Sequence, residues 1–231
     1  MKKSAKPRPQ LKLSEEQLCQ DQGYNLVAGV DEVGRGCLAG PVVASAVIMR
    51  RDSCPSWYKK VRDSKQLSPE QRSELSPRIH EAAVSVGTGF VESYLIDELG
   101  MTAAVYLAMR LAISRLMPGP QYVLIDYLTI PRLKLPQKGV KDGDSLCFSI
   151  ACASIVAKVY RDTLMQELDM QYPGYGLARH KGYCTHEHLE CLRKLGPSDI
   201  HRHLFQPVRN IAQLSFADLQ KWQAEIEQDD P

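Results

Sequence analysis

Two adjacent acidic residues, Asp31 and Glu32, directly follow a short apolar run, and Asp126 ends another such run. A carboxylate is costly to bury, so an acid at this place needs a cap, an ion pair, solvent or a cation. A single aspartate at a strand end is usually a turn former. Two acidic strand ends are more informative, because neighbouring parallel strands would place Asp31 and Asp126 side by side at one edge of a sheet.

A fourth acid, Asp144, stands where a long helix is predicted to begin. Its ordinary role there is the N-cap, which the neighbouring Ser145 can fill equally well. Three or four clustered carboxylates repel one another unless a divalent cation compensates their charge. All-oxygen ligands suit manganese or magnesium rather than zinc. The four acids therefore form a candidate Mn²⁺ or Mg²⁺ site of the kind used in two-metal phosphodiester hydrolysis.

The segment after the first two acids is rich in glycine. Gly34-Arg35-Gly36 with Ala39 matches the dinucleotide-binding pattern G-x-G-x-x-G/A. That pattern requires a helix directly after the glycines, whereas here Pro41 and a β-branched run follow, which disfavours a dinucleotide site. The glycines more readily allow the backbone to approach a ligand beside the acids, with Arg35 as a candidate phosphate contact.

Hydrophobic patterning predicts the elements that must position these residues. Strands are predicted at residues 26–30, 41–49, 83–92 and 122–126. Helices are predicted to start at Ser14, to run from Ser68 to about His80, to cover 96–117 with a break at Gly100, and to run from Leu146 to about Tyr172. The first two strands should pair as a hairpin, and Gly87 with Gly89 suggests a bulge. The fold class is therefore α/β, a mixed sheet with helices packed on it.

Composition and charge set further limits. The 231 residues are 44% hydrophobic and 24% charged, and the net charge of +2 does not by itself indicate a nucleic-acid binder. We find no secretory signal and no membrane span, and seven cysteines are best explained as reduced thiols. We therefore expect a cytoplasmic protein without a membrane partner, and a monomer. Residues 1–12 form a basic tail expected to be disordered, and the chain from 175 to 231 should be helical without strands.

The stretch from 179 to 209 carries six lysines and arginines against three acids, and five of the six histidines. The spacing of these histidines to Cys184 and Cys191 matches no zinc motif, which disfavours structural zinc. A basic substrate-binding surface is the better interpretation, with histidines contacting phosphate and with Lys181 and Arg202 as its best members.

Two features remain open at this point. Ser154, Lys158 and Arg161 share one face of the long helix, where a solvated face with a local Arg161–Asp162 ion pair competes with a role near a substrate. Tyr183, taken alone, is a packing residue or a surface aromatic more often than a residue that stacks on nucleic acid.

The chain resembles type 2 ribonuclease H (ribonuclease HII) over about residues 25 to 209. The stretch AGVDEVGRG at 28–36, followed by LAGPV at 38–42, is similar to the opening motif of that family. Further matches follow in order at Asp63-Ser-Lys65, 124–126, 143–145, 150–158 with Arg161-Asp162, 172–176, 180–183, 196–197 and 201–202. Many ordered motifs make this match far more specific than the glycine pattern alone.

The resemblance implies a ribonuclease H-like mixed sheet, with a catalytic core at 13–174 and a C-terminal helical substrate-binding region at 175–231. It implies endonucleolytic cleavage of RNA in RNA–DNA hybrids and beside single ribonucleotides in duplex DNA, leaving 3′-hydroxyl and 5′-phosphate ends. The four acids fall on Asp31, Glu32, Asp126 and Asp144. The ribose-sensing loop falls on Gly34-Arg35-Gly36 and the junction-reading tyrosine on Tyr183.

The chain departs from the family pattern near the site. Tyr127-Leu128 replaces the usual Gly-Asn, and Asp142 replaces a usual lysine, which adds negative charge beside the acids. A non-enzymatic nucleic-acid-binding module and a two-metal phosphatase for small molecules are the alternatives. Retention of all four acids argues against the first, and the basic stretch argues for a polymeric substrate and against the second.

Overall fold

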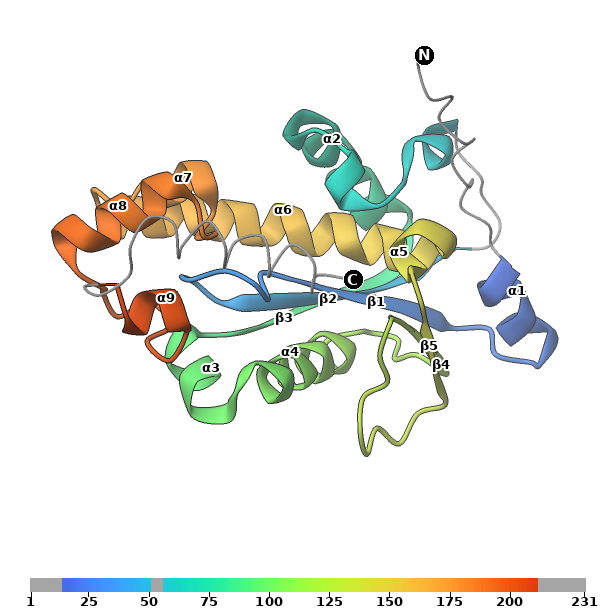
Figure 1. The fold of residues 1–231 in the computed structure, drawn as a ribbon. Coiled ribbons are helices and arrows are strands. Elements are labelled where there is room, and N and C mark those ends of the chain that lie inside the picture. The colour runs from blue at the N-terminus through green and yellow to red at the C-terminus, as the bar shows by residue number, and fades with distance from the viewer. Residues whose placement is uncertain (1–13, 51–55, 212–231) are drawn as a thin grey trace, which may run out of the picture.

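The structure, a computed structural model, describes residues 14–50 and 56–211. A five-stranded mixed sheet lies between two layers of helices (Figure 1). Its strand order is β3-β2-β1-β4-β5, with β1 at Val27–Val33, β2 at Val42–Met49, β3 at Ala83–Val91, β4 at Tyr122–Asp126 and β5 at Gln137–Val140. The predicted fold class, a mixed sheet with flanking helices, is confirmed.

The pairing of β1 decides where the site forms. β1 pairs with β2 in an antiparallel ladder, so the predicted hairpin is confirmed. On its other side β1 pairs with β4 in parallel. The last strand, β5, extends the sheet beside β4 in a segment for which no strand was predicted. Only Val140 of its four residues is buried, so the sequence lacks the hydrophobic pattern that would predict a strand here.

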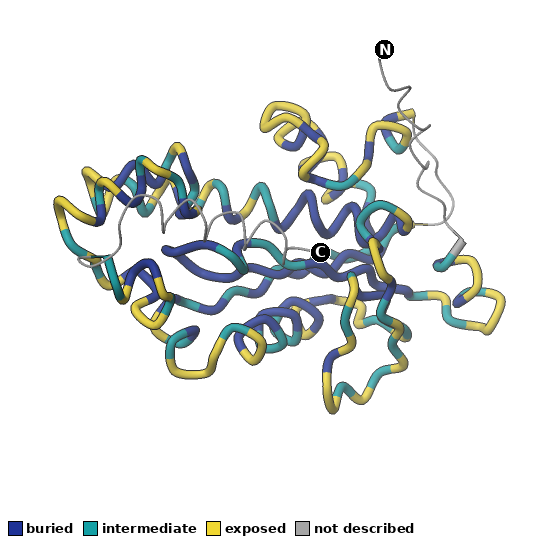
Figure 2. The backbone as a smooth tube through the Cα atoms, viewed as in Figure 1, coloured by how far each residue is buried: buried dark blue, intermediate teal, exposed yellow. Residues whose placement is uncertain are grey.

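The helices cover both faces of the sheet. They are α1 (Ser14–Asp21), α2 (Pro69–Ala82), α3 (Ser93–Leu99), α4 (Met101–Ser114), α5 (Gly143–Leu146), α6 (Phe148–Gln171), α7 (Leu177–His180), α8 (His186–Leu195) and α9 (Gln206–Arg209), with short 3-10 turns η1 (Ser56–Lys60) and η2 (Ser64–Gln66). α4 packs on one face and α6 on the other, with α2 outside α6 (Figure 1). The sheet and the inner sides of these helices are buried (Figure 2).

Gly87 and Gly89 do not mark a bulge, contrary to the prediction. The register shift of this ladder lies instead at Ile48/Met49. A Cβ on Gly87 would lie 2.2 Å from the Ala112 carbonyl oxygen, and one on Gly89 would lie 2.4 Å from that of Ala108. These glycines therefore allow α4 to pack closely on β3.

The predicted long helix is interrupted at Cys147, whose extended backbone separates α5 from α6. Neither Asp144 nor Ser145 caps α6. Instead the buried carboxylate of Glu16 accepts the backbone N–H of Ser149 at 2.8 Å and its hydroxyl at 2.7 Å. An acid from far away in the sequence thus stabilises the N-terminus of α6, which leaves Asp144 available for another role.

The C-terminal part of the chain contributes α7, α8 and α9. As predicted, it forms no strand up to residue 211, although Ala39 and His201 make an isolated bridge. The predicted basic tail at 1–12 lies outside the described residues, as does the segment after 211. Among the described helices, none combines the length and apolar character needed to span a membrane.

Candidate active site

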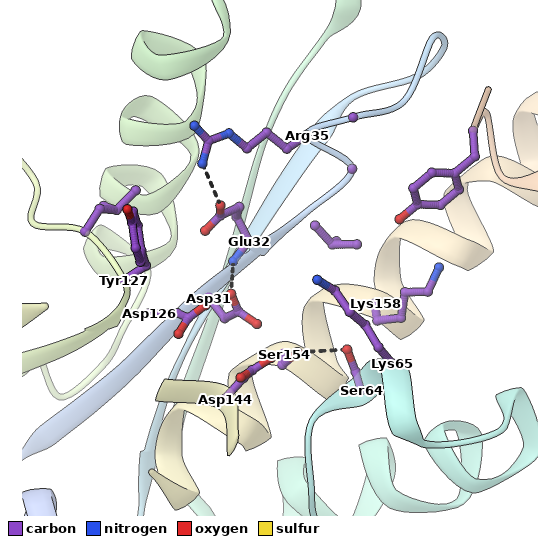
Figure 3. A pocket seen from close by; sticks show the side chains of 15 residues that line it. Asp31, Glu32, Arg35, Ser64, Lys65, Asp126, Tyr127, Asp144, Ser154 and Lys158 are labelled. Carbon is purple, nitrogen blue, oxygen red and sulfur yellow. Dashed lines mark hydrogen bonds and ion pairs between the residues drawn. The ribbon is translucent and has the colours of Figure 1, made fainter. Parts of the chain in front are cut away.

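β1 and β4 bring two of the predicted acids together. Val30 pairs with Ile125 in the parallel ladder, so Asp31 and Asp126 are the next residues on the two strands. Side chains alternate between the faces of a strand, and Val30 and Ile125 pack into the core beneath α4. Asp31 and Asp126 therefore project from the opposite face, toward α5 and α6 (Figure 3). Their predicted side-by-side placement is confirmed.

Burial and like charge dominate the electrostatics of these two acids. Burial, followed by the charges of Glu32 and Asp126, raises the pKa of Asp31 well above its usual range, whereas a hydrogen bond from Ser154 opposes the shift. One Asp31 oxygen also accepts the Glu32 backbone N–H at 2.7 Å. The pKa of Asp126 is raised chiefly by burial, although its Oδ1 accepts the Gly143 N–H at 2.7 Å.

Asp144 joins this group from α5. Burial, then the charges of Asp63 and Asp126, raises its pKa to about 7, and a hydrogen bond with the Asp63 side chain favours its protonated form. The nearby charge of Lys65 opposes this shift. Asp63 is a further acid that sequence analysis did not assign to the site. The signal for it was the polar Asp63-Ser64-Lys65 motif, which was noted only as part of the resemblance.

The chemistry of the donor set fits a divalent cation of the Mg²⁺ or Mn²⁺ type, because the side chains offer only oxygen ligands. Burial is the main cause that raises the pKa values of Asp31, Asp126 and Asp144, and charges of neighbouring acids add to each shift; a bound cation would favour the ionised carboxylates. Within residues 14–50 and 56–211, no three His, Cys, Asp or Glu side chains already converge at ligand distance. The acids would therefore have to turn toward an ion to bind it.

Four more polar residues line the same pocket, Ser64, Lys65, Ser154 and Lys158 (Figure 3). The hydroxyls of Ser64 and Ser154 lie 2.8 Å apart and join η2 to α6. α6 packs against β1 and β2, and its residues Ser154 and Lys158 line the pocket of the acids. Of the two interpretations left open for this face, the one with an Arg161–Asp162 ion pair is wrong. Asp162 accepts a hydrogen bond from Lys158 at 2.7 Å, and Arg161 donates to backbone carbonyl oxygens instead.

Arg202 holds the glycine loop, residues 34–41, through hydrogen bonds to its backbone carbonyl oxygens. Its guanidinium donates to the carbonyl oxygens of Gly34 at 2.6 Å, Arg35 at 2.8 Å and Gly40 at 2.9 and 3.1 Å. The side chain is fully buried, and burial lowers its pKa to about 9. The prediction that Arg202 belongs to an exposed basic surface is therefore wrong, because its donors are used within the protein.

Arg161 binds the same loop at Ala39 and Pro41. It is fully buried and donates to the carbonyl oxygens of Ala39 at 3.1 Å, Pro41 at 3.0 Å and Lys181 at 2.9 Å. Gly34 has a φ of +89° and rests on this side chain, so that an added Cβ would lie 2.2 Å from the Arg161 Nε. The close approach at Gly34 is thus to an arginine of the protein, whereas a ligand was expected there.

Tyr183 reaches the pocket from the loop after α7. Its ring lies 5.5 Å from Lys158 Nζ and 5.8 Å from Arg161 Cζ, and the residue is 37% exposed. Lys181 is half-buried, and its Nζ lies 3.3 Å from the Asp162 carbonyl oxygen. Of the predicted substrate-binding residues, Tyr183 and the 34–36 segment line the pocket, whereas Lys181 and Arg202 do not.

Three of the clustered histidines are structural, which corrects their interpretation as phosphate contacts. His180, His188 and His201 are buried, and His188 Nε2 lies 3.1 Å from His201 Nε2. Burial is the main cause that lowers the pKa of His188 to about 3 and that of His201 to about 4. Neutral rings of this kind cannot attract phosphate by charge. They pack the C-terminal helices together instead.

Comparison with known proteins decides the family. A family model described as Ribonuclease HII matches residues 28–208. The chain belongs to the ribonuclease HII family. A ribonuclease HII of Dehalococcoides mccartyi is 54% identical over 198 residues, which cover 86% of this chain and 93% of the relative. One from Geotalea uraniireducens is 48% identical over 204 residues, which cover 87% of this chain and 92% of the relative.

Solved structures agree with this assignment. The ribonuclease H2 of Pyrococcus horikoshii OT3 superposes with a TM-score of 0.68 at 25% identity, over 80% of this chain and 96% of that structure. Bst-RNase HIII in complex with Mn²⁺ has a TM-score of 0.61 at 19% identity, over 81% of this chain and 69% of that structure, and supports the fold alone. Membership of the ribonuclease HII family makes the chain a phosphodiester hydrolase, an endonuclease that degrades RNA in RNA–DNA hybrids.

Proposed function

We propose that this endonuclease cleaves RNA in hybrids, and duplex DNA on the 5′ side of single embedded ribonucleotides, by two-metal-ion hydrolysis that leaves 3′-hydroxyl and 5′-phosphate ends. One observation carries the proposal. Asp31, Asp126 and Asp144 lie on one side of the sheet, and their mutual charge contributes to raising the pKa of Asp31. Such an arrangement is unfavourable for folding alone, which is typical of a site that binds a charged cofactor.

Asp31, Glu32, Asp126 and Asp144 would hold the cations, with Mn²⁺ or Mg²⁺ as the candidates. When bound, two such ions supply the charge that activates an attacking water and stabilises the leaving oxygen. The Mn²⁺ complex of Bst-RNase HIII supports this choice by analogy of fold. The protein contributes the rigid strand ends, the Gly143 N–H that orients Asp126, and the Ser154 hydroxyl beside Asp31.

Basic side chains on the pocket wall would bind the phosphates of the substrate. Lys65 and Lys158 line one side, and Arg35 lies near Glu32 with 3.7 Å between Nη1 and Oε1. The phosphates of a bound hybrid lie close to the acids and are repelled by them. Positively charged side chains that line the pocket offset this repulsion between substrate and carboxylates. We assign Lys65, Lys158 and Arg35 this role.

The glycine loop would recognise the ribose. In a trans peptide the carbonyl and the N–H point in opposite directions. The carbonyls of Gly34 and Arg35 are bound to Arg202, so the N–H groups of Arg35 and Gly36 point away from it. These two N–H groups donate to no other group in the described ranges. They are suited to meet the 2′-hydroxyl, which is the group that distinguishes RNA from DNA.

The C-terminal region, 175–231, would complete the substrate site. Tyr183 would stack on the deoxyribose next to the ribonucleotide, and Lys181 would approach the backbone farther from the acids. The placement of Tyr183 beside Lys158 supports this, because an aromatic ring next to a cation suits a sugar-phosphate chain.

Substitution of the acids tests the proposal. Asp31→Asn and Asp126→Asn should each abolish cleavage of a hybrid while leaving hybrid binding largely intact, because the amide keeps the shape and loses the charge that holds a cation. Glu167→Gln, at an exposed position on α6, is the matched control and should cleave at the wild-type rate. Cleavage by either aspartate variant at near wild-type rate would show that the site is elsewhere.

A further inference from the structure

Tyr127 lies directly beyond Asp126, at the turn that follows β4, and lines the pocket of the acids. The residue is 57% exposed. It lies on the side of Asp126 away from Lys65 and Lys158 (Figure 3). Tyr183 belongs to the lysine side, because its ring lies 5.5 Å from Lys158 Nζ. Two tyrosines therefore flank the acids from opposite sides.

The backbone of Tyr127 is strained. Its φ of 60° lies in the left-handed region, which is unfavourable for most residues that carry a Cβ. Neighbouring contacts impose this conformation, since the Tyr127 N–H donates to the Val140 carbonyl at 2.8 Å and the Leu128 N–H to that of Asp126 at 2.7 Å. On β5, a Cβ at Gly139 would lie 2.8 Å from the Leu128 carbonyl oxygen, so the strand packs directly on the turn.

Local backbone preference and core packing both fail to explain a tyrosine at this position. Glycine or asparagine would adopt the same backbone with less strain, and the Gly-Asn pattern of the family fits this turn. The exposed ring of Tyr127 adds little to the core. Residues with a strained backbone cluster at functional sites, where the function of the side chain accounts for the unfavourable conformation.

We propose that Tyr127 contacts the substrate, with its ring stacked on a nucleotide of the bound duplex on the opposite side of the scissile phosphate from Tyr183. An exposed aromatic face in a pocket that takes nucleic acid suits stacking on a base or a sugar. The inference rests on the proposed function. Because the fixed turn holds Tyr127 beside Asp126, the contact would set the register of the strand relative to the acids.

Three variants test this inference. Tyr127→Asn keeps the left-handed backbone and removes the ring, and Tyr127→Phe keeps the ring and removes the hydroxyl. Arg132→Asn is the control, because Arg132 is exposed, has a φ of 58° and does not line the pocket. The measurements are KM and kcat on a duplex with one ribonucleotide, binding of the same duplex in EDTA, and the melting temperature.

Tyr127→Asn should weaken binding and raise KM by about 5- to 160-fold, the range expected for one lost stacking contact, with a smaller change in kcat. Its melting temperature should be equal to or above that of the wild type, because the strain is relieved. Tyr127→Phe should bind within about twofold of the wild type, since the face that stacks is retained. Arg132→Asn places an asparagine at another positive-φ position away from the pocket and should leave KM unchanged.

An unchanged KM for Tyr127→Asn would overturn the inference, as would a loss in Tyr127→Phe equal to that in Tyr127→Asn. Either result leaves the proposed function intact, provided the wild type cuts at the ribonucleotide. A wild type that does not cut there overturns that part of the proposed function before the variants are compared.

Discussion

Gly34→Ala probes how tightly the ribose-sensing loop rests on Arg161. The new Cβ would lie 2.2 Å from Arg161 Nε, and the side chain below it is fully buried and bound to three carbonyls. The guanidinium cannot move away without losing these hydrogen bonds. We therefore expect the substitution to destabilise the protein as well as the loop.

The magnitude follows from two costs. An alanine held in the left-handed region costs about 1–2 kcal/mol, of which about 0.4–1 kcal/mol is offset because alanine restricts the unfolded chain. Overpacking against Arg161 adds about 1–3 kcal/mol. Gly23→Ala isolates the first cost, because Gly23 has a φ of +95° and no atom within 4 Å of the added Cβ.

Thermal or urea unfolding without substrate measures the difference between the two variants. Gly34→Ala should be less stable than Gly23→Ala by about 1–3 kcal/mol, which lowers the melting temperature by roughly 2–12 °C for a chain of this size. Equal stability of the two variants would refute the reasoning, since it would mean that the loop does not rest on Arg161 as described.

Three further outcomes are expected. Burial lowers the pKa of His188 to about 3 and that of His201 to about 4, so the unfolded state binds more protons than the folded state between those values and about pH 6.5. These histidines therefore make the free energy of unfolding fall as the pH is lowered through this range. His188→Gln should reduce the slope of unfolding free energy against pH by up to about 1.4 kcal/mol per pH unit. Tyr183→Ala should weaken incision at a single ribonucleotide by about 5- to 160-fold in steady-state assays, whereas Tyr183→Phe should retain it. Gly29→Ala should fail to yield stable protein on expression and thermal melting, since its Cβ would lie 2.2 Å from the backbone carbon of Ser149; a normal melt would contradict that packing.

Two simple rules predicted that Asp31 and Asp126 would lie side by side if their strands were parallel neighbours, and the structure supplies that pairing. Apolar runs mark buried strands, and neighbouring parallel strands end at one edge. The same rules could not find β5, whose residues are mostly exposed, nor the break at Cys147, where a carboxylate from α1 caps the helix. The cap at the helix break depends on a contact between segments far apart in sequence.

Charge was the least reliable guide to location. Arg202 was expected to contact the substrate, and for Arg161 a solvated face competed with a role near the substrate, yet both side chains are buried. A sequence gives the type of a side chain but not whether the fold supplies carbonyl oxygens for it. Clustered histidines misled for the same reason, because His188 and His201 satisfy each other inside the C-terminal region.

Cleavage of two matched duplexes tests the central claim most directly. One is a DNA duplex with a single ribonucleotide and the other is its all-DNA twin, each incubated with Mn²⁺ or Mg²⁺ and again with EDTA. The account predicts one cut on the 5′ side of the ribonucleotide, with 3′-hydroxyl and 5′-phosphate ends, only in the first duplex and only with the cation. Equal cutting of both duplexes, or cutting that persists in EDTA, would contradict it.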